Sequence, residues 1–121
     1  MNKKFAKQIK AKVAFMPSTE LRLMAEFAQE ELTTRRNCWV EDMYRRFSAK
    51  ENAGMATAIR MSDPGDSWLT DRVVVTCFKD KNRSKVSVGM ARLAPHDEFD
   101  FRTGVAIAFA RAMGMQVPDL F

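Results

Sequence analysis

Two β-branched segments joined by a short polar turn constrain the fold of this chain more than any other feature. Arg72 to Lys79 (RVVVTCFK) is β-branched and aromatic, and Lys85 to Leu93 (KVSVGMARL) alternates larger apolar residues with small ones. The residues between them, DKNRS, are polar. Strand-forming residues on both sides of a polar turn predict an antiparallel β-hairpin over residues 72–93.

A helix is predicted after the hairpin, from about Phe101 to Met113. Asp97 or Asp100 is expected to cap it, because a carboxylate there accepts hydrogen bonds from the free amides of the first turn. Gly114 is expected to end the helix in a left-handed conformation. Gly104 and four alanines make this helix thin. A thin helix can approach a sheet closely, so we expect it to pack directly on the hairpin.

The N-terminal part is predicted to alternate between regular elements and polar breaks. Its first residues fit both helical and strand spacing, and we expect a short helix from Lys3 to Gln8 and a strand from Ile9 to Phe15. Ser18 is expected to cap a following helix whose apolar stripe continues to Leu32. A polar, basic connection over residues 33–37 is predicted to end that helix.

A second helix is predicted from Asn37, which would cap it, with its apolar face made by Val40, Met43, Tyr44 and Phe47. The alternative is a strand around Cys38 to Val40. Residues 49–67 are predicted to form a loop or flap, because they include an Asp-Pro-Gly turn sequence. A short strand at about 57–61 is possible within that segment.

These elements predict a single α+β domain over residues 1–121, in which a small, mainly antiparallel β-sheet carries helices packed on one face. The net charge of +5 is concentrated at the N-terminus. From Pro17 onward the chain holds 15 basic and 15 acidic residues, so the excess forms a basic arm over residues 1–16. Before Glu20 there is no acid, and the arm's positive residues are Lys3, Lys4, Lys7, Lys10 and Lys12.

Such an arm has two interpretations that the residues leave open. It can bind nucleic-acid phosphates, with release of their counterions, or it can be a solvated face that makes the protein more soluble. No stretch approaches the roughly 20 apolar residues that a membrane span needs, so no membrane partner is expected. The chain also lacks the features of a secretory signal, and two cysteines without metal-ligand spacing fit a reducing cytoplasm.

The densest polar cluster is Pro-His-Asp-Glu-Phe-Asp at residues 95–100. Its carboxylates are candidates for a cation site and His96 for a general base. Capping of the last helix explains the acids better, because they lie where its free amides and positive dipole end are expected. A pair of Cys77 and His96 has no accompanying nucleophile-elbow sequence, and there is no phosphate-binding glycine motif. We therefore expect no catalytic site, cofactor or metal.

Residues 89–112 carry a pattern of the form G-x-A-x-x-x-P-x-D-x-F-D-x-x-x-G-x-x-I-A-x-x-R-A. The matching positions are Gly89, Ala91, Pro95, Asp97, Phe99, Asp100, Gly104, Ile107, Ala108, Arg111 and Ala112. This stretch resembles the C-terminus of small uncharacterised proteins encoded by phages and prophages of Gram-positive bacteria. The resemblance implies an accessory protein of a mobile element, a class that includes anti-CRISPR inhibitors, and it implies no particular activity.

The expected function is non-enzymatic: inhibition of a bacterial defence complex by protein binding. The expected partner is a protein of the bacterial host, such as a CRISPR effector or another nucleic-acid-processing complex, in the host cytoplasm. Aromatic and arginine side chains are the expected anchors; they are Arg35, Arg36, Trp39, Tyr44, Arg45, Arg46, Trp68, Arg102 and Arg111. The alternative is direct nucleic-acid binding by the lysine arm, and the oligomeric state is open.

Overall fold

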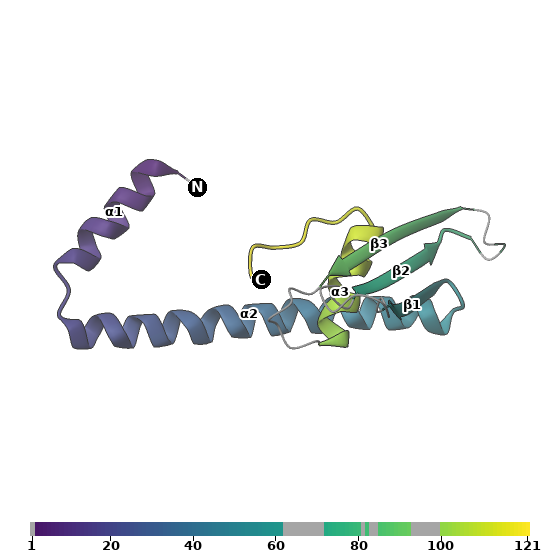
Figure 1. Ribbon diagram of the computed structural model, residues 1–121, viewed down its shortest axis with the longest axis horizontal. Coiled ribbons are helices and arrows are strands. Elements are labelled where there is room, and N and C mark those ends of the chain that lie inside the picture. The colour runs from purple at the N-terminus through teal and green to yellow at the C-terminus, as the bar shows by residue number, and fades with distance from the viewer. Residues whose placement is uncertain (1, 62–71, 81, 83–84, 93–99) are drawn as a thin grey trace, which may run out of the picture. The chain divides into compact units, whose positions relative to one another are not determined.

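A computed structural model describes residues 2–61, 72–80, 82, 85–92 and 100–121 of the chain. By contacts, the chain divides into two compact units, Met1–Arg35 and Arg36–Phe121. The predicted α+β class is confirmed, with helices and an antiparallel sheet (Figure 1). In chain order the elements are α1 (Lys3–Ala14), α2 (Ser18–Asn52), β1 (Ala56–Met61), β2 (Arg72–Phe78), β3 (Val86–Arg92) and α3 (Phe101–Ala112).

Within the described residues, three antiparallel strands form one sheet in the order β1-β2-β3. The predicted hairpin is confirmed as β2 and β3, and the possible strand near residues 57–61 is confirmed as β1. On the central strand, Val75 lies opposite Ala58 on one side and opposite Gly89 on the other. The sheet therefore joins the predicted hairpin to a strand from the segment that was predicted to be mainly loop.

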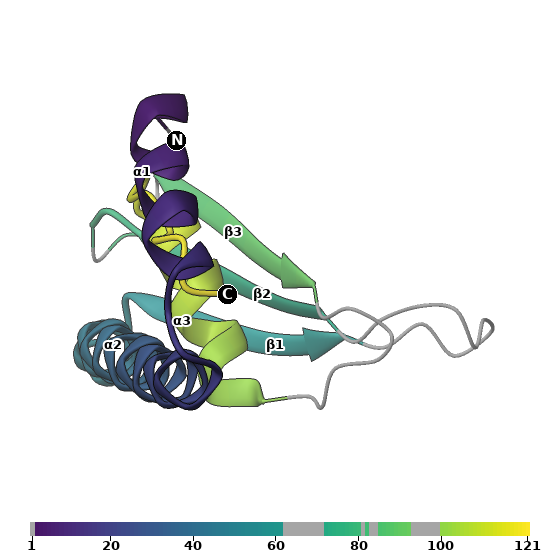
Figure 2. The ribbon, with the colours of Figure 1, turned by 90° about the vertical axis from the view of Figure 1, so that its left-hand side faces the viewer.

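One face of the sheet is covered by helices, as predicted. Val73, Val75 and Cys77 alternate along β2 and are almost fully buried. Helix α3 packs on β2 and β3 (Figure 2), and the end of α2 adds Phe47 to the same core. The rings of Phe47 and Phe109 meet edge to face with centroids 6.1 Å apart.

Two glycines let α3 lie close to the sheet. A Cβ atom on Gly89 would collide with the backbone carbonyl oxygen of Ala108, and one on Gly104 would lie 2.9 Å from Cγ2 of Val73. Four of the α3 alanines are fully or nearly fully buried. The expectation that small residues permit close helix-to-sheet packing is therefore confirmed.

Three predictions for the N-terminal part were wrong: the length of the first helix, the strand after it and the cap of the next helix. The strand at residues 9–15 is absent, and α1 is helical over Lys3–Ala14, with Asn2 accepting a hydrogen bond from the Lys4 amide. Helical spacing of Phe5, Ile9 and Val13 prevails over strand alternation. Ser18 is the first residue of α2 rather than its cap, because the Pro17 carbonyl already accepts the hydrogen bond of the Leu21 amide.

Helix α2 is continuous over 35 residues, so the predicted break at residues 33–37, the cap at Asn37 and the alternative strand at 38–40 were wrong. The segment holds neither Pro nor Gly, and polarity without a backbone breaker does not end a helix. An ion pair of 3.0 Å between Glu31 and Arg35 spans one turn there. The helix reaches Asn52, which also shortens the predicted 49–67 loop; residues 62–67 lie outside the described part.

The boundaries of α3 follow the prediction closely. Asp100 is its N-cap and accepts a hydrogen bond from the Arg102 amide, and Gly114 takes a positive φ of 72° after its end. Asp97, the other expected cap, lies outside the described residues. Phe101, the first residue of α3, is 39% exposed. The tail beyond α3 packs back on the core through Met115 and Val117.

Candidate binding surface

The second face of the sheet is not covered by α2 or α3, and its side chains are the best candidates for a working surface. Because β2 buries its odd-numbered residues, its even-numbered residues and their neighbours on β1 and β3 point the other way. We call this surface the open face. Its residues are Thr57, Ile59, Met61, Arg72, Val74, Thr76, Phe78, Val86, Val88, Met90 and Arg92.

Large apolar side chains dominate the open face and are in contact with solvent. Val88 is 59% exposed, Ile59 58% and Val86 51%. The register places Ile59, Val74 and Met90 in one row across all three strands. Neighbouring rows add further apolar residues, so the exposed side chains form a continuous patch rather than scattered positions. Contiguous exposed apolar patches on proteins mark sites of association.

These side chains point outward because of the way α3 packs on the sheet. On β3, Gly89 and Ala91 are buried, whereas Val86 and Val88 are exposed. Hydrophobicity alone would place the valines inside and the small residues outside. The backbone of α3 leaves no room for a side chain at Gly89, so the strand must turn its small residues inward. The valines are consequently presented to solvent.

Two arginines lie at one end of the open face. Arg72 on β2 is directly opposite Arg92 on β3, and both follow the same alternation away from the helices. Neither guanidinium is paired with a carboxylate in the part of the chain that the structure describes. Opposed like charges on neighbouring strands repel one another. This end of the face therefore carries a concentrated positive charge next to the apolar rows.

The two described aromatic anchors expected from the sequence are partly buried against the core. Trp39 meets Phe121 of the tail edge to face, with ring centroids 5.6 Å apart. Tyr44 stacks near Phe47, with centroids 6.1 Å apart, and is half-buried. Both side chains hold elements of the second unit together. Trp68, the third expected aromatic anchor, lies outside the described residues.

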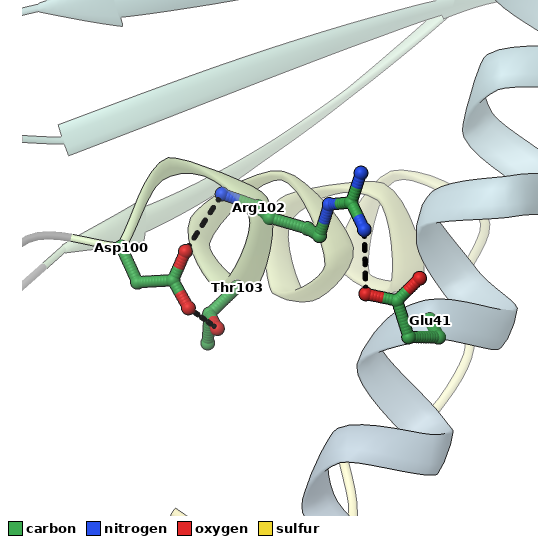
Figure 3. A network of polar contacts seen from close by, with 4 residues as sticks. All are labelled: Glu41, Asp100, Arg102 and Thr103. Atoms are coloured by element: carbon green, nitrogen blue, oxygen red, sulfur yellow. Dashed lines mark hydrogen bonds and ion pairs between the residues drawn. The ribbon is translucent and has the colours of Figure 1, made fainter.

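Arg102 is engaged by a residue of the fold, and its side chain remains 52% exposed. Its Nη1 donates a 2.7 Å hydrogen bond to Oε1 of Glu41, which joins α3 to α2 (Figure 3). Its guanidinium also lies 4.5 Å from the centre of the Tyr44 ring. The hydrogen bond and charge of Glu41 raise the pKa of Arg102. Next to it, the Thr103 hydroxyl donates to the Asp100 carboxylate (Figure 3).

Arg111 is likewise engaged: it donates a 2.7 Å hydrogen bond to the backbone carbonyl of Met90 on β3. Three of the predicted arginines of α2 form ion pairs on the helix surface, Arg35 with Glu31 and both Arg45 and Arg46 with Asp42. Arg36 also lies on α2. Among the described residues, the structure thus brings Tyr44 and Arg102 into contact, and it brings Arg45 and Arg46 to the same carboxylate, Asp42.

The five predicted lysines gather on α1, where all of them are exposed. Helical spacing places most of them opposite Phe5 and Ile9, whose side chains are also solvent-accessible. Among the described residues, these lysines have no ion-pair partner. The lysine arm is therefore a basic amphipathic helix rather than an extended segment.

The described residues contain no arrangement typical of catalysis. Cys77 lines a pocket of about 310 Å³ together with Lys50, Lys79 and Ser87. Burial raises the pKa of its thiol, which Lys50 offsets only in part, so it is held as the weakly nucleophilic thiol. No group of three metal-binding side chains occurs within the described residues. His96, and with it the expected polar cluster at residues 95–99, lies outside them.

The open face was missed in the sequence, although a signal for it was present. Three consecutive valines, Val73 to Val75, make β2 apolar on both sides, which is unusual for a strand with one solvated face. On β3 the alternation was visible, but its direction depended on α3. Apolar residues on both faces of a short hairpin indicate a second covering layer, supplied either by the same chain or by another molecule.

Comparisons with known proteins add no relative to this picture. No protein-family model matches the chain, and neither the curated proteins nor the solved structures give a significant match. None of the described helices has the length and apolarity that crossing a bilayer requires. Inference about function therefore depends on the geometry of the open face and on the chemistry of its residues.

Proposed function

We propose that this chain is a non-enzymatic protein-binding module whose working surface is the open face of the sheet. The observation that carries the proposal is the row of Ile59, Val74 and Met90 with the exposed valines of β3 beside it. Burial of each such side chain in a complex contributes up to about 1.5–3 kcal/mol. Covering a face of this composition with a partner therefore lowers the free energy of the system.

A protein partner suits this surface better than a nucleic acid. Proteins that bind single strands stack the bases on aromatic rings. On the open face Phe78 is the aromatic residue, and the remaining apolar side chains are aliphatic. Duplex binding relies on many basic contacts to phosphates, whereas the basic residues of this face are the arginines at one end. Aliphatic rows with a charged end are typical of protein interfaces, with an apolar centre and a polar rim.

The biological role that we propose is inhibition of a bacterial defence complex, with a CRISPR effector or another nucleic-acid-processing complex as the partner. The resemblance of residues 89–112 to proteins of phages and prophages supports this role. In that setting the protein acts in the cytoplasm of the bacterial host. A small binding module inhibits by occupying a surface that its target needs.

Co-purification with matched variants tests the binding function. The immobilised full chain is incubated with a lysate of a Gram-positive bacterium, and bound proteins are identified by mass spectrometry. Val88→Asp places a carboxylate on the open face, and Phe27→Asp places one at an exposed apolar residue of α2 in the first unit. Wild type and Phe27→Asp are expected to recover the same partner, and Val88→Asp is expected to lose it. Equal recovery by all three proteins contradicts the proposal.

The inhibitory role needs a separate measurement. DNA cleavage by a purified CRISPR effector with its guide is followed with and without the wild-type chain. Inhibition that disappears with Val88→Asp supports both the role and the surface. If the recovered partner is unrelated to nucleic-acid processing and no effector is inhibited, the binding function stands and the role is wrong.

The lysines of α1 favour a second candidate function, direct nucleic-acid binding. Their charges are exposed and have no acidic partner among the described residues. Such binding is expected to weaken steeply with salt, with a log–log slope of about −0.9 for each duplex phosphate neutralised. Deletion of residues 1–12 should abolish it. Binding of a labelled duplex that is unchanged by this deletion rejects the α1 candidate.

A further inference from the structure

We propose that the open face accepts a partner segment in which an Asp or Glu precedes a run of apolar residues, with the carboxylate bound between Arg72 and Arg92. The inference rests on the proposed protein-binding function and specifies the chemistry of the partner. It is carried by the register of β2 and β3, which places the two arginines directly opposite each other beside the apolar rows.

Within the part of the chain that the structure describes, the arginine pair lacks a neutralising carboxylate. Cross-strand neighbours with like charge destabilise a sheet, and most of the other described arginines discussed above have a partner, such as Glu31, Glu41 or Asp42. Arg72 and Arg92 have no carboxylate partner in the described residues. An anion bound between them offsets their mutual repulsion and accepts charge-assisted hydrogen bonds from both guanidinium groups.

The chemistry of the arginine side chain and its surroundings favours a carboxylate. The planar guanidinium donates two parallel hydrogen bonds to the two oxygens of a carboxylate. A phosphate would satisfy the same donors, but the next row along the strands is aliphatic, with Val74 at its centre. A nucleotide base would have no ring to stack on there. An apolar side chain of a peptide fits that row directly.

The spacing of the rows fixes the pattern of the partner. Side chains on the same face of a strand recur every second residue, about 7 Å apart. Val74 therefore lies about one such step from Arg72, and Thr76 and Phe78 follow at equal steps. A partner in strand conformation matches this with an acid followed by apolar residues at every second position. A helical partner matches it with apolar residues three and four positions after the acid.

A displayed library of random peptides provides the test, with the full-length wild-type chain as bait. Enriched peptides are expected to contain an acid followed by apolar residues at one of these spacings. Arg72→Glu is expected to weaken their binding by about tenfold or more. A peptide whose acid is replaced by Lys should bind Arg72→Glu better than it binds the wild type. The charge-matched control Arg45→Glu, at an exposed arginine of α2, should leave binding unchanged.

Folding of each variant is checked by its thermal unfolding midpoint. Arg72→Glu places an acid opposite Arg92, so its midpoint should not fall, and lost binding cannot be ascribed to lost structure. Peptides that lack acids, bind Arg72→Glu as tightly as the wild type, and are lost with Val88→Asp overturn the inference but leave the binding function intact. Failure to enrich any peptide, or peptides indifferent to Val88→Asp, overturns both.

Two other occupants are separated by the same variants. A labelled RNA or DNA duplex that binds the wild type and is lost with Arg72→Glu identifies phosphate as the ligand and overturns the inference. Self-association of the wild-type chain in sedimentation, abolished by Arg72→Glu and by Val88→Asp, assigns the open face to a second copy and also overturns it. A monomeric chain that binds acidic peptides and not the duplex supports the proposal.

Discussion

Replacement of Gly89 by alanine is expected to destabilise the second unit strongly, although alanine is ordinarily the better residue in a strand. Gly89 lies in β3 under α3, where an added Cβ atom would collide with the carbonyl oxygen of Ala108 and approach the amide nitrogen of Ala112. Both are backbone atoms of a helix and cannot rotate away. Relief of the collision requires α3 to move away from the sheet.

The size of the effect follows from two opposing contributions. Overpacking of a core costs about 1–3 kcal/mol, and a collision with backbone falls at the upper end of that range. Loss of the glycine's freedom in the unfolded chain returns about 0.4–1 kcal/mol. The net loss is about 2–3 kcal/mol. For a unit of this size that corresponds to a fall of about 10–20 °C in the unfolding midpoint.

Urea unfolding followed by circular dichroism measures the free energy of unfolding, with Gly104→Ala as the matched control. A Cβ atom on Gly104 meets a side-chain methyl group of Val73 at 2.9 Å rather than backbone atoms, so relief needs a smaller movement than at Gly89. The helix propensity of alanine, better than that of glycine by about 0.8–1.0 kcal/mol, offsets the cost of that shift. Gly89→Ala as stable as wild type, or more stable, refutes the argument that α3 dictates which residues β3 buries.

Two substitutions and two properties of Cys77 test other parts of the structure. Arg72→Glu is expected to raise the free energy of unfolding by about 0.2–1 kcal/mol in urea titration, because it turns the repulsion with Arg92 into attraction; a decrease contradicts the pairing. Asp100→Ala is expected to lower it by about 0.5–2 kcal/mol through loss of the α3 cap, and no change would show that the cap is dispensable. Native Cys77 should react with iodoacetamide far more slowly than exposed Cys38. Equal reaction rates for the two thiols would contradict the burial of Cys77. Stability should also decline as pH rises above the ordinary thiol pKa of 9.0, because the thiol ionises in the unfolded chain before it ionises in the folded protein. A free energy of unfolding that does not fall in that range contradicts the raised pKa.

The elements predicted correctly are those whose signals are local. The hairpin of β2 and β3 follows from β-branched residues around a polar turn, and the ends of α3 follow from Asp100 and Gly114. Local signals are misleading at residues 33–37, where polar side chains predict a break although neither Pro nor Gly interrupts the helix. Helix α2 continues there because its residues retain helical hydrogen bonding whatever their polarity.

The candidate surface depended on information that no single segment carries. Whether Val88 or Gly89 points inward is decided by the distance of α3 from β3, and α3 is distant in sequence from the residues it constrains. Exposed aromatic and arginine anchors were predicted from residue type alone. Trp39, Tyr44 and Arg102 instead contact Phe121, Phe47 and Glu41 within the fold. The exposed side chains of the open face are mainly aliphatic, with Arg72 and Arg92 at one end.

Methyl NMR of the full chain during titration with its co-purified partner tests directly whether the open face is the binding surface. Isotope labels on isoleucine and valine methyl groups report Ile59, Val86 and Val88 on the open face, with buried Val73 and Val105 as internal references. If the open face binds the partner, its methyl signals shift or broaden on binding, while the signals of the buried references change little. Changes confined to Ile9 and Val13 of α1, with the open-face signals unmoved, would contradict it.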